Sequence, residues 1–279
     1  MSEHDVIKKT RAPATVGTLK AEFSALGILP GMVLLVHSSL SALGWICGGA
    51  VAVIQALLEA LGEEGTLVMT TFTAGLTDPK HWQHPPVPED WKDTIRAETP
   101  AFNPLLTPTR QMGKIAETFR TWPGAVRSNH PHCSFAALGP HADKIVSDHQ
   151  LENGSGEGSP LARIYELDGW VLLLGVWFGN NSSMHLSEYR ASYTGKAYDL
   201  NGAPMVVDGR RQWVPVRDLL VDSDDFPAIG EAIVAEAQVV RTGRVGEATA
   251  LLMPQRSIVD YAVGWMETHR NEARNLGGS

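Results

Sequence analysis

Short apolar runs alternate with segments of helical periodicity through most of the chain. A run such as Val33–His37 is bounded by glycine, proline or serine, which is typical of a buried strand. Between the first two runs, apolar residues recur at helical spacing from Val51 to Leu61, and Gly62 follows. Residues 33–70 therefore predict a strand–helix–strand unit with parallel strands, whose carboxyl ends usually hold the ligand. The runs expected to be buried strands are Val33–His37, Thr66–Met69, Ser134–Leu138 and Val171–Val176, with a short strand near Ala248–Met253.

Other segments have the spacing of amphipathic helices. A helix is expected at 19–26, and Ser159 before Pro160 is the usual opening of another that extends to about Leu167. Asp208-Gly209 lies between two β-rich runs, 205–207 and 213–216, and predicts a hairpin. Four further helices are expected, at Gln111–Arg120, Met184–Arg190, Ile229–Val240 and Ile258–Arg270.

These elements predict one α/β domain rather than two. Residues 1–17 have the composition of a loose N-terminal leader, and residues 18–279 form the expected single domain. Within it, residues 74–110 carry seven prolines and three large aromatic residues, which indicates a long ordered loop rather than a linker. The expected architecture has three α/β/α layers, a mostly parallel central sheet and a small antiparallel addition.

Composition narrows the class of protein. Of 279 residues, 43% are hydrophobic, which is enough for a sizeable core, and 31 acidic against 23 basic residues give a net charge of −8. No basic block is present, so nucleic acid and anionic membranes are unsuitable partners. Two cysteines, Cys47 and Cys133, exclude a disulfide scaffold. No apolar run reaches the ~20 residues that span a bilayer, and the first residues lack a signal-peptide core, so a cytoplasmic protein is expected.

The first candidate site follows the first predicted strand. Hydroxyl and backbone N–H groups of His37-Ser38-Ser39-Leu40 at a strand-to-helix turn suit the oxygens of a phosphate, and Gly48 and Gly49 permit close backbone approach. The glycine-lysine pattern of a Walker loop and the GxGxxG pattern are both absent from the sequence. A capped turn without a ligand is the alternative interpretation.

The second candidate site follows the strand expected at 171–176. A Gly/Asn/Ser loop there leads into a helix with His185 in its first turn, and Glu188 three residues later lies on the same face. A helix N-terminus disfavours imidazolium, which favours a neutral histidine that acts as a base near pH 7. A histidine that merely packs or caps is the alternative.

Two further clusters admit functional interpretations. His130 and His132, together with His81 and His84, suggest a metal site, but their spacing fits no zinc motif. An acidic cluster precedes the helix expected at 229–240, where acidic residues commonly support a helix start. The same cluster would also receive ammonium groups. Its members are Asp218, Asp222, Asp224 and Asp225, and Asp78 of the proline-rich segment is a further candidate.

Taken together, several of these motifs resemble the aminoglycoside 3-N-acetyltransferase family, the antibiotic acetyltransferases. They occur in the family's order and cover about residues 16 to 270. The matching pieces are Leu35-Val36-His37-Ser38-Ser39-Leu40, Gly65-Thr66-Leu67-Val68-Met69, Arg127-Ser128-Asn129-His130-Pro131, Ser134-Phe135-Ala136-Ala137-Leu138-Gly139, and Leu172-Leu173-Leu174-Gly175-Val176 followed by Asn181-Ser182-Ser183-Met184-His185-Leu186-Ser187-Glu188.

The resemblance implies a fold and a reaction. The fold is distinct from the common small acetyltransferase fold, and the reaction transfers the acetyl group of acetyl-CoA to the 3-amino group of a 2-deoxystreptamine ring, which gives antibiotic resistance. Ser38 and Ser39 would bind the CoA phosphates, with His37, Leu40, Gly48 and Gly49 around them. His185 would be the catalytic histidine. Asp78 and Asp225, or Asp224 or Asp222 in place of Asp225, would face the aminoglycoside.

The chemistry of amide formation completes this hypothesis. An ammonium group must lose a proton before it attacks a thioester, so His185 is the expected base, oriented by Glu188 or Asp225. Thr71, Thr73 or nearby backbone N–H groups are the candidate oxyanion donors, in a stretch that departs from the family pattern. Direct transfer requires neither a cysteine nucleophile nor a metal. A homodimer is an option that the sequence leaves open.

Three alternatives remain. One is a family acetyltransferase that acts on a different amine. Another is a metal-dependent amidohydrolase built on His130, His132, His81 or His84. The third is a protein that binds CoA or an aminoglycoside without catalysis.

Overall fold

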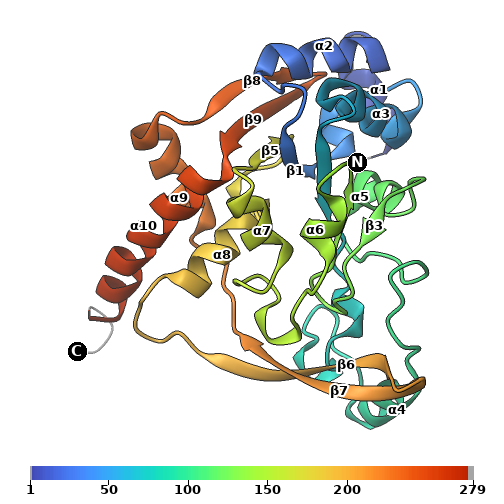
Figure 1. The fold of residues 1–279 in the computed structure, drawn as a ribbon, viewed down its shortest axis with the longest axis vertical. Coiled ribbons are helices and arrows are strands. Elements are labelled where there is room, and N and C mark those ends of the chain that lie inside the picture. Colours follow the sequence, from blue (N-terminus) through green and yellow to red (C-terminus); the bar gives the residue numbers. More distant parts are fainter. Residues whose placement is uncertain (1, 276–279) are drawn as a thin grey trace.

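A seven-stranded sheet with helices on both faces forms the body of the molecule, and a long two-stranded hairpin crosses below it (Figure 1). The structure is a computed structural model and describes residues 2–275. The helices are α1 (Glu3–Lys9), α2 (Val16–Leu26), α3 (Gly49–Leu61), α4 (Lys92–Glu98), α5 (Gly113–Phe119), α6 (Ala142–Val146), α7 (Pro160–Glu166), α8 (Ser183–Arg190), α9 (Phe226–Ala232) and α10 (Gln255–Asn275). The strands are β1 (Val33–Ser38), β2 (Thr66–Thr70), β3 (Val126–Arg127), β4 (Phe135–Leu138), β5 (Trp170–Leu174), β6 (Tyr198–Val207), β7 (Arg210–Leu219), β8 (Arg241–Val245) and β9 (Ala248–Pro254).

The central sheet has the strand order β3-β4-β2-β1-β5-β9-β8. The middle strand β1 pairs in parallel with β2 on one side and with β5 on the other, where Ser38 lies opposite Leu174. The remaining pairs are antiparallel because only β4 and β9 run against the other five strands. The carboxyl ends of β1, β2 and β5 thus meet at one edge of the sheet, as parallel strands require.

Alternating residues of the central strands fill two separate cores. Leu34 and Val36 of β1 pack with α2, α3 and α5, whereas Val33 and Leu35 pack with the helices of the opposite face, among them α6 and α7. Beside them, Val171 and Leu173 of β5 pack against α8, α9 and α10. Apolar side chains on both faces explain why these strands have continuous apolar sequences. The structure confirms the expected three-layer α/β fold with a small antiparallel addition.

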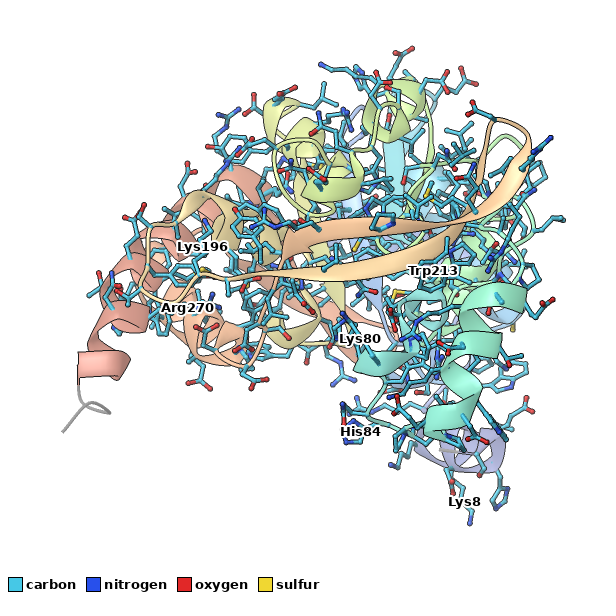
Figure 2. All side chains as sticks on the ribbon, turned by 90° about the horizontal axis from the view of Figure 1, so that it is seen from below. Lys8, Lys80, His84, Lys196, Trp213 and Arg270 are labelled. Atoms are coloured by element: carbon cyan, nitrogen blue, oxygen red, sulfur yellow. The ribbon has the colours of Figure 1, made fainter. Side chains whose placement is uncertain are left out.

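The hairpin β6–β7 follows α8 in the chain and packs against the proline-rich segment. Figure 2 shows it crossing the molecule from the side of Lys196 and Arg270 to the side of Trp213 and Lys80. The Phe102 N–H donates to the Pro204 carbonyl (2.8 Å), and the Lys80 ammonium donates to the Leu200 carbonyl (2.8 Å). Residues 74–110 therefore lie against the hairpin, and α4 and three short 3₁₀ turns are their only regular elements in the described structure.

Several elements differ from the sequence prediction. The expected leader contains α1, and Ala14 is buried and bridges to Ile46. The hairpin strands are ten residues each, much longer than the runs that predicted them. Helix α9 ends at Ala232 in a π-helical turn, Ile233–Ala237. Within the described part of the chain, no helix has the length and apolar character needed to cross a membrane.

Candidate active site

A cavity of about 1040 Å³ opens at the carboxyl end of β1. Its walls come from the end of β1 and the turn behind it, from the start of α3, and from the residues before α8. Residues 111–114, where α5 begins, contribute a further wall that includes Lys114. The parallel centre of the sheet thus creates the cavity at the edge where the strand pattern predicts it.

Most of the residues expected to bind the cofactor line this cavity. They are His37, Ser38, Ser39, Leu40 and Gly49. Gly48, the N-cap of α3, immediately precedes Gly49 and is not part of the cavity lining. The φ angles of Gly48 and Gly49 are 88° and 56°, a left-handed conformation that favours glycine. The positive end of α3 and the residue Lys114 favour an anionic ligand here. Glu3 and Glu117 also line the cavity, and Glu117 is paired with Arg120.

His185 and Glu188 form a close polar pair on α8, directly after the residues Asn180 and Ser182 that line the cavity. The His185 Nδ1 atom lies 2.6 Å from Glu188 Oε2, and Glu188 is fully buried. A carboxylate only accepts, so Nδ1 carries the proton and the lone pair of His185 is on Nε2. The ring also packs against Phe226, with centroids 4.9 Å apart. The histidine is therefore fixed in the tautomer that a general base needs.

Arg270 of α10 links Glu188 to Asp225. Its Nη1 donates to Glu188 Oε1 (2.9 Å), and its Nε and Nη2 donate to the two oxygens of Asp225 (2.7 and 2.8 Å). Burial alone would lower the pKa of Arg270, but the two carboxylates outweigh it and raise the pKa. The Asp222 N–H donates to Glu188 Oε1 as well (2.8 Å), so this carboxylate is fully engaged. Sequence reasoning missed Arg270, because an arginine near the end of an amphipathic helix carries no distinguishing signal.

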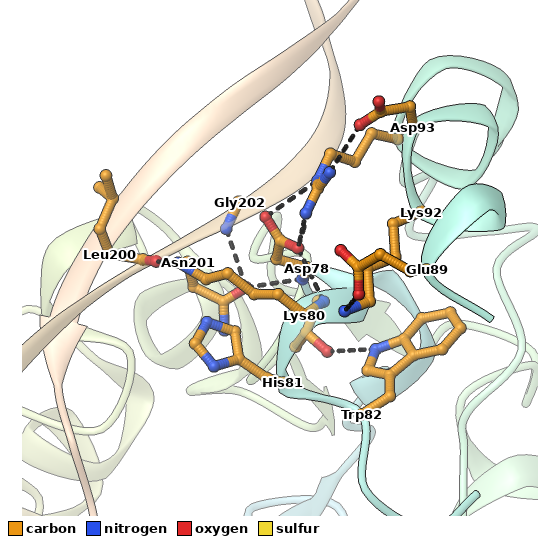
Figure 3. Close-up of polar contacts among 12 residues, drawn as sticks. Asp78, Lys80, His81, Trp82, Glu89, Lys92, Asp93, Leu200, Asn201 and Gly202 are labelled. Atoms are coloured by element: carbon orange, nitrogen blue, oxygen red, sulfur yellow. Dashed lines mark hydrogen bonds and ion pairs between the residues drawn. The ribbon is translucent and has the colours of Figure 1, made fainter. Parts of the chain in front are cut away.

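The acidic residues expected at the acceptor side have different surroundings. Asp78 forms an ion pair with Arg96 (2.8 Å), accepts from the Lys80 N–H (2.9 Å), and its own N–H donates to Asn201 of β6 (2.7 Å) (Figure 3). Burial tends to raise the pKa of Asp78, but the hydrogen bonds from Arg96 and Lys80 lower it. Asp225 is bound to Arg270, as described above. Asp224 is exposed, and its N–H donates to Asp222.

Thr71 does not fit the expected role of oxyanion donor. Its hydroxyl accepts from Arg127 Nε (3.1 Å) and lies 3.1 Å from the Ser134 hydroxyl, in a fully buried network. The Thr73 hydroxyl donates to the Pro131 carbonyl. The adjacent Thr70 lines the cavity instead. The alternation along an extended chain accounts for this correction, because neighbouring side chains point to opposite sides.

His130, His132 and His149 pack together away from the cavity. The Nδ1 atom of His130 accepts from the backbone N–H of His132 (3.1 Å) and of Cys133 (3.0 Å), while His149 lies between the Ser128 hydroxyl and the Gly154 carbonyl, each 2.9 Å away. Burial lowers the pKa of His132 and of His149 to about 4. Across residues 2–275, no group of three or more His, Cys, Asp or Glu side chains is arranged to hold a metal ion. These rings serve as buried hydrogen-bond partners of loops.

A mixed α/β sheet with a cavity at its carboxyl edge and a fixed His–Glu pair suits an acyltransferase, and the comparison with known families identifies the class. Residues 35–267 match the sequence model of the family described as "Aminoglycoside 3-N-acetyltransferase". The chain belongs to this family and is an acyltransferase.

Individual relatives are similar over almost their full length. The aminoglycoside N(3')-acetyltransferase-like protein YokD of Bacillus subtilis is 44% identical over 97% of this chain and 98% of its own, and its crystal structure superposes with a TM-score of 0.93 over 95% of this chain and 98% of that one. Aminoglycoside N(3)-acetyltransferase VII of Streptomyces paromomycinus is 36% identical over the whole of both chains. The structure described as "AAC-IIIb binary with CoASH" has a TM-score of 0.83 at 29% identity, over 93% of this chain and 98% of that one.

Proposed function

We propose that this chain transfers the acetyl group of acetyl-CoA to the 3-amino group of 2-deoxystreptamine aminoglycosides, with His185 as the general base. The observation that carries the proposal is the 2.6 Å contact between His185 and a fully buried Glu188, beside a cavity lined by strand-end serines. The family supports N-acetylation of aminoglycosides, a modification that gives antibiotic resistance.

The cavity suits the donor. A nucleotide thioester needs room, a site for its phosphates and a path for its acyl end. The serines after β1, the N-terminus of α3 and Lys114 supply hydroxyl, N–H and ammonium groups for phosphate oxygens. The related structure with bound CoASH has the same fold, which supports placing the donor in this family's cavity.

The His185–Glu188 pair suits the chemistry. The amine attacks in its neutral form and loses an N–H proton as the amide forms. The Nε2 lone pair of His185 is available to take this proton. The buried carboxylate of Glu188 stabilises the imidazolium that results, while Arg270 holds this carboxylate in place. The His185 side chain is 17% exposed, so an acceptor amine reaches it from solvent.

Thiol release from acetyl-CoA tests this proposal. We expect aminoglycoside-dependent release by the wild type and a loss on the order of 10²–10⁴-fold in kcat for His185→Ala. The matched control is His84→Ala, which replaces an exposed histidine and should retain full activity. Acetyl-CoA binding by calorimetry should survive in both variants. Equal activity of His185→Ala and the wild type would refute the role of the base.

A different amine acceptor is the second candidate, and one observation favours it. Asp78 and Asp225, which would receive the ammonium groups of an aminoglycoside, are each bound to an arginine of the same chain. The acceptor side is thus less anionic than the net charge of −8 suggests. Thiol release with simple amines of low charge, and none with aminoglycosides, would select this candidate.

A further inference from the structure

His37 is a buried polar side chain to which the mechanism above gives no chemical role. It is the penultimate residue of β1 and lines the cavity next to Ser38, with only 7% of its surface exposed. Alternation along β1 turns His37 toward the face that carries α8, opposite to the face of Val36. The histidine thus lies between the cavity and the helix of the general base.

One hydrogen bond fixes the tautomer of His37. The backbone N–H of Ser182, immediately before α8, donates to His37 Nε2 (3.4 Å). A backbone N–H only donates, so Nε2 is unprotonated and the proton of the neutral ring is on Nδ1. Burial, together with the nearby His185, lowers the pKa of His37 to about 3, so the ring is neutral near pH 7.

The Nδ1–H group is a donor open to the cavity. Among the described residues, Nδ1 has no hydrogen-bond partner. It does not belong to the fully buried polar atoms that lack a partner, such as Asn181 Nδ2 and Gln255 Oε1, so Nδ1 is accessible. His37 therefore offers a proton on Nδ1, whereas His185 offers a lone pair on Nε2. Both rings are in the Nδ1–H tautomer, but one offers its proton and the other its lone pair. An addition to a carbonyl needs both, because the nucleophile loses a proton while the oxygen gains charge.

We propose that His37 is a catalytic residue whose neutral Nδ1–H donates to the carbonyl oxygen of the donor's acyl group and stabilises its oxyanion. The inference rests on the proposed acetyl transfer. In the step, the amine nitrogen bonds to the carbonyl carbon, the C=O π pair moves to oxygen, and His185 Nε2 takes the amine proton. When the intermediate collapses, the C=O bond re-forms, the C–S bond breaks, and the proton passes from His185 to the leaving thiolate.

Two isosteric variants separate this role from a structural one. In His37→Asn, the amide nitrogen takes about the place of Nδ1, so the cavity donor is kept and the contact to Ser182 is lost. In His37→Gln, the side-chain amide reaches the place of Nε2, so the contact to Ser182 is kept and the cavity donor is lost. Both variants are first checked for folding by thermal denaturation and for acetyl-CoA affinity by calorimetry.

The expected result is that His37→Gln lowers kcat on the order of 10²-fold while the acetyl-CoA affinity is unchanged, and that His37→Asn stays within about tenfold of the wild type. The reverse order would show that the ring merely supports the start of α8, and equal loss or equal retention in the two variants also overturns the proposal.

The carbonyl stretch of ¹³C-labelled acetyl-CoA provides a test that needs no acceptor. We expect isotope-edited infrared spectra to show a lowered frequency on the wild type and on His37→Asn, and the frequency of free acetyl-CoA on His37→Gln. If the frequency on His37→Gln is as low as on the wild type, the proposal is overturned. If His37→Asn does not fold, the spectrum of His37→Gln is sufficient for the test. If the wild type binds acetyl-CoA but acetylates no aminoglycoside, the proposed acceptor fails while this test still applies. If it binds no acetyl-CoA, both proposals fail.

Discussion

Glu188 Oε2 lies 2.6 Å from His185 Nδ1, while the other oxygen of the same carboxylate accepts from Arg270 at 2.9 Å. One buried carboxylate thus orients the histidine and is itself held by a residue 82 positions later in the chain. Because each partner uses a different oxygen, the charge of Glu188 and its orientation are separable by mutation.

Glu188→Gln should keep the shape of the site and lose the charge. We expect kcat to fall on the order of 10²–10⁴-fold because the amide no longer stabilises the imidazolium of His185. Steady-state thiol release measures the effect, and acetyl-CoA affinity should change little. Glu157→Gln is the control, since this exposed glutamate pairs with Arg190, which lies on the same helix as Glu188. A Glu188→Gln variant with wild-type kcat would contradict the assignment.

Arg270→Met should destabilise the protein more than Arg256→Met. Both arginines lie on α10 and both are ion-paired, but the Arg270 side chain is 13% exposed and that of Arg256 is 45% exposed. Loss of Arg270 leaves Glu188 buried without its cation, at a cost of about 3 kcal/mol in the free energy of unfolding, whereas an exposed pair contributes about 0–1 kcal/mol. Urea denaturation of the two variants makes the comparison, and equal effects would contradict it.

Lys114→Gln should weaken donor binding without changing the chemical step. The ammonium lines the cavity, so its removal should raise the KM for acetyl-CoA about three- to tenfold at low salt, with kcat unchanged. Lys144→Gln, on the exposed surface of α6, is the control. The difference between the two variants should shrink as ionic strength rises. A Lys114→Gln variant that lowers kcat and spares the KM would place the lysine elsewhere in the mechanism.

Stability should fall as the pH drops from about 6.5 to about 4. His132 and His149 have folded-state pKa values of about 4, below the ordinary value of 6.5, because they are buried. In this window the unfolded chain binds protons that the folded chain does not, so the free energy of unfolding decreases toward acid. The contribution of the two histidines to stability is complete above pH 6.5 and is lost as the pH falls to about 4. Each ring contributes up to about 3 kcal/mol to the change.

His149→Gln tests this pH dependence. The slope of unfolding free energy against pH should decrease by about 1.4 kcal/mol per pH unit between pH 6.5 and 4. His84→Gln, at an exposed position, should leave the slope unchanged. Denaturant titrations at a series of pH values give both slopes.

Neither cysteine should be needed for turnover. Burial raises the pKa of the Cys133 thiol to about 12, with Asp218 adding to the effect, so its thiolate is scarce at neutral pH. The double variant Cys47→Ala/Cys133→Ala should keep kcat within about twofold of the wild type, since direct transfer uses no acyl-enzyme. An inactive double variant that still folds and binds acetyl-CoA would show otherwise.

The strands of the fold were predictable where both faces of a strand are buried. Such strands, β1 and β5 among them, have continuous apolar sequences, and glycine or serine marks their ends. The exposed elements carried a weaker signal. The hairpin strands mix polar and apolar residues without a clear alternation, and β8 is an edge strand with arginine at two of its five positions. Tertiary contacts, rather than local sequence, give these segments their structure.

In the candidate site, contacts within one helix were predictable from the sequence, and contacts between distant elements were not. His185 and Glu188 are three residues apart on one helix, so their spacing predicts the contact. Arg270 reaches Glu188 from α10, and the tautomer of His37 depends on a backbone N–H from residue 182, which the sequence of β1 cannot indicate. The sequence does not indicate which side of the extended chain at Thr70 and Thr71 faces the cavity, so it cannot distinguish the two threonines.

The long hairpin and the proline-rich segment are bound to each other outside the central sheet. Strand β6 binds Asp78 through Asn201, and Arg211 of β7 donates to the carbonyls of Arg96 and Thr99, so the hairpin and the proline-rich segment brace each other outside the sheet. The His–Glu pair belongs instead to α8, and most of the cavity walls belong to the sheet, its helices and the turns between them, with Thr109 as the contribution of the proline-rich segment. Because these hydrogen bonds join the two segments to each other, we expect a change in one of them to be tolerated best with a matching change in the other.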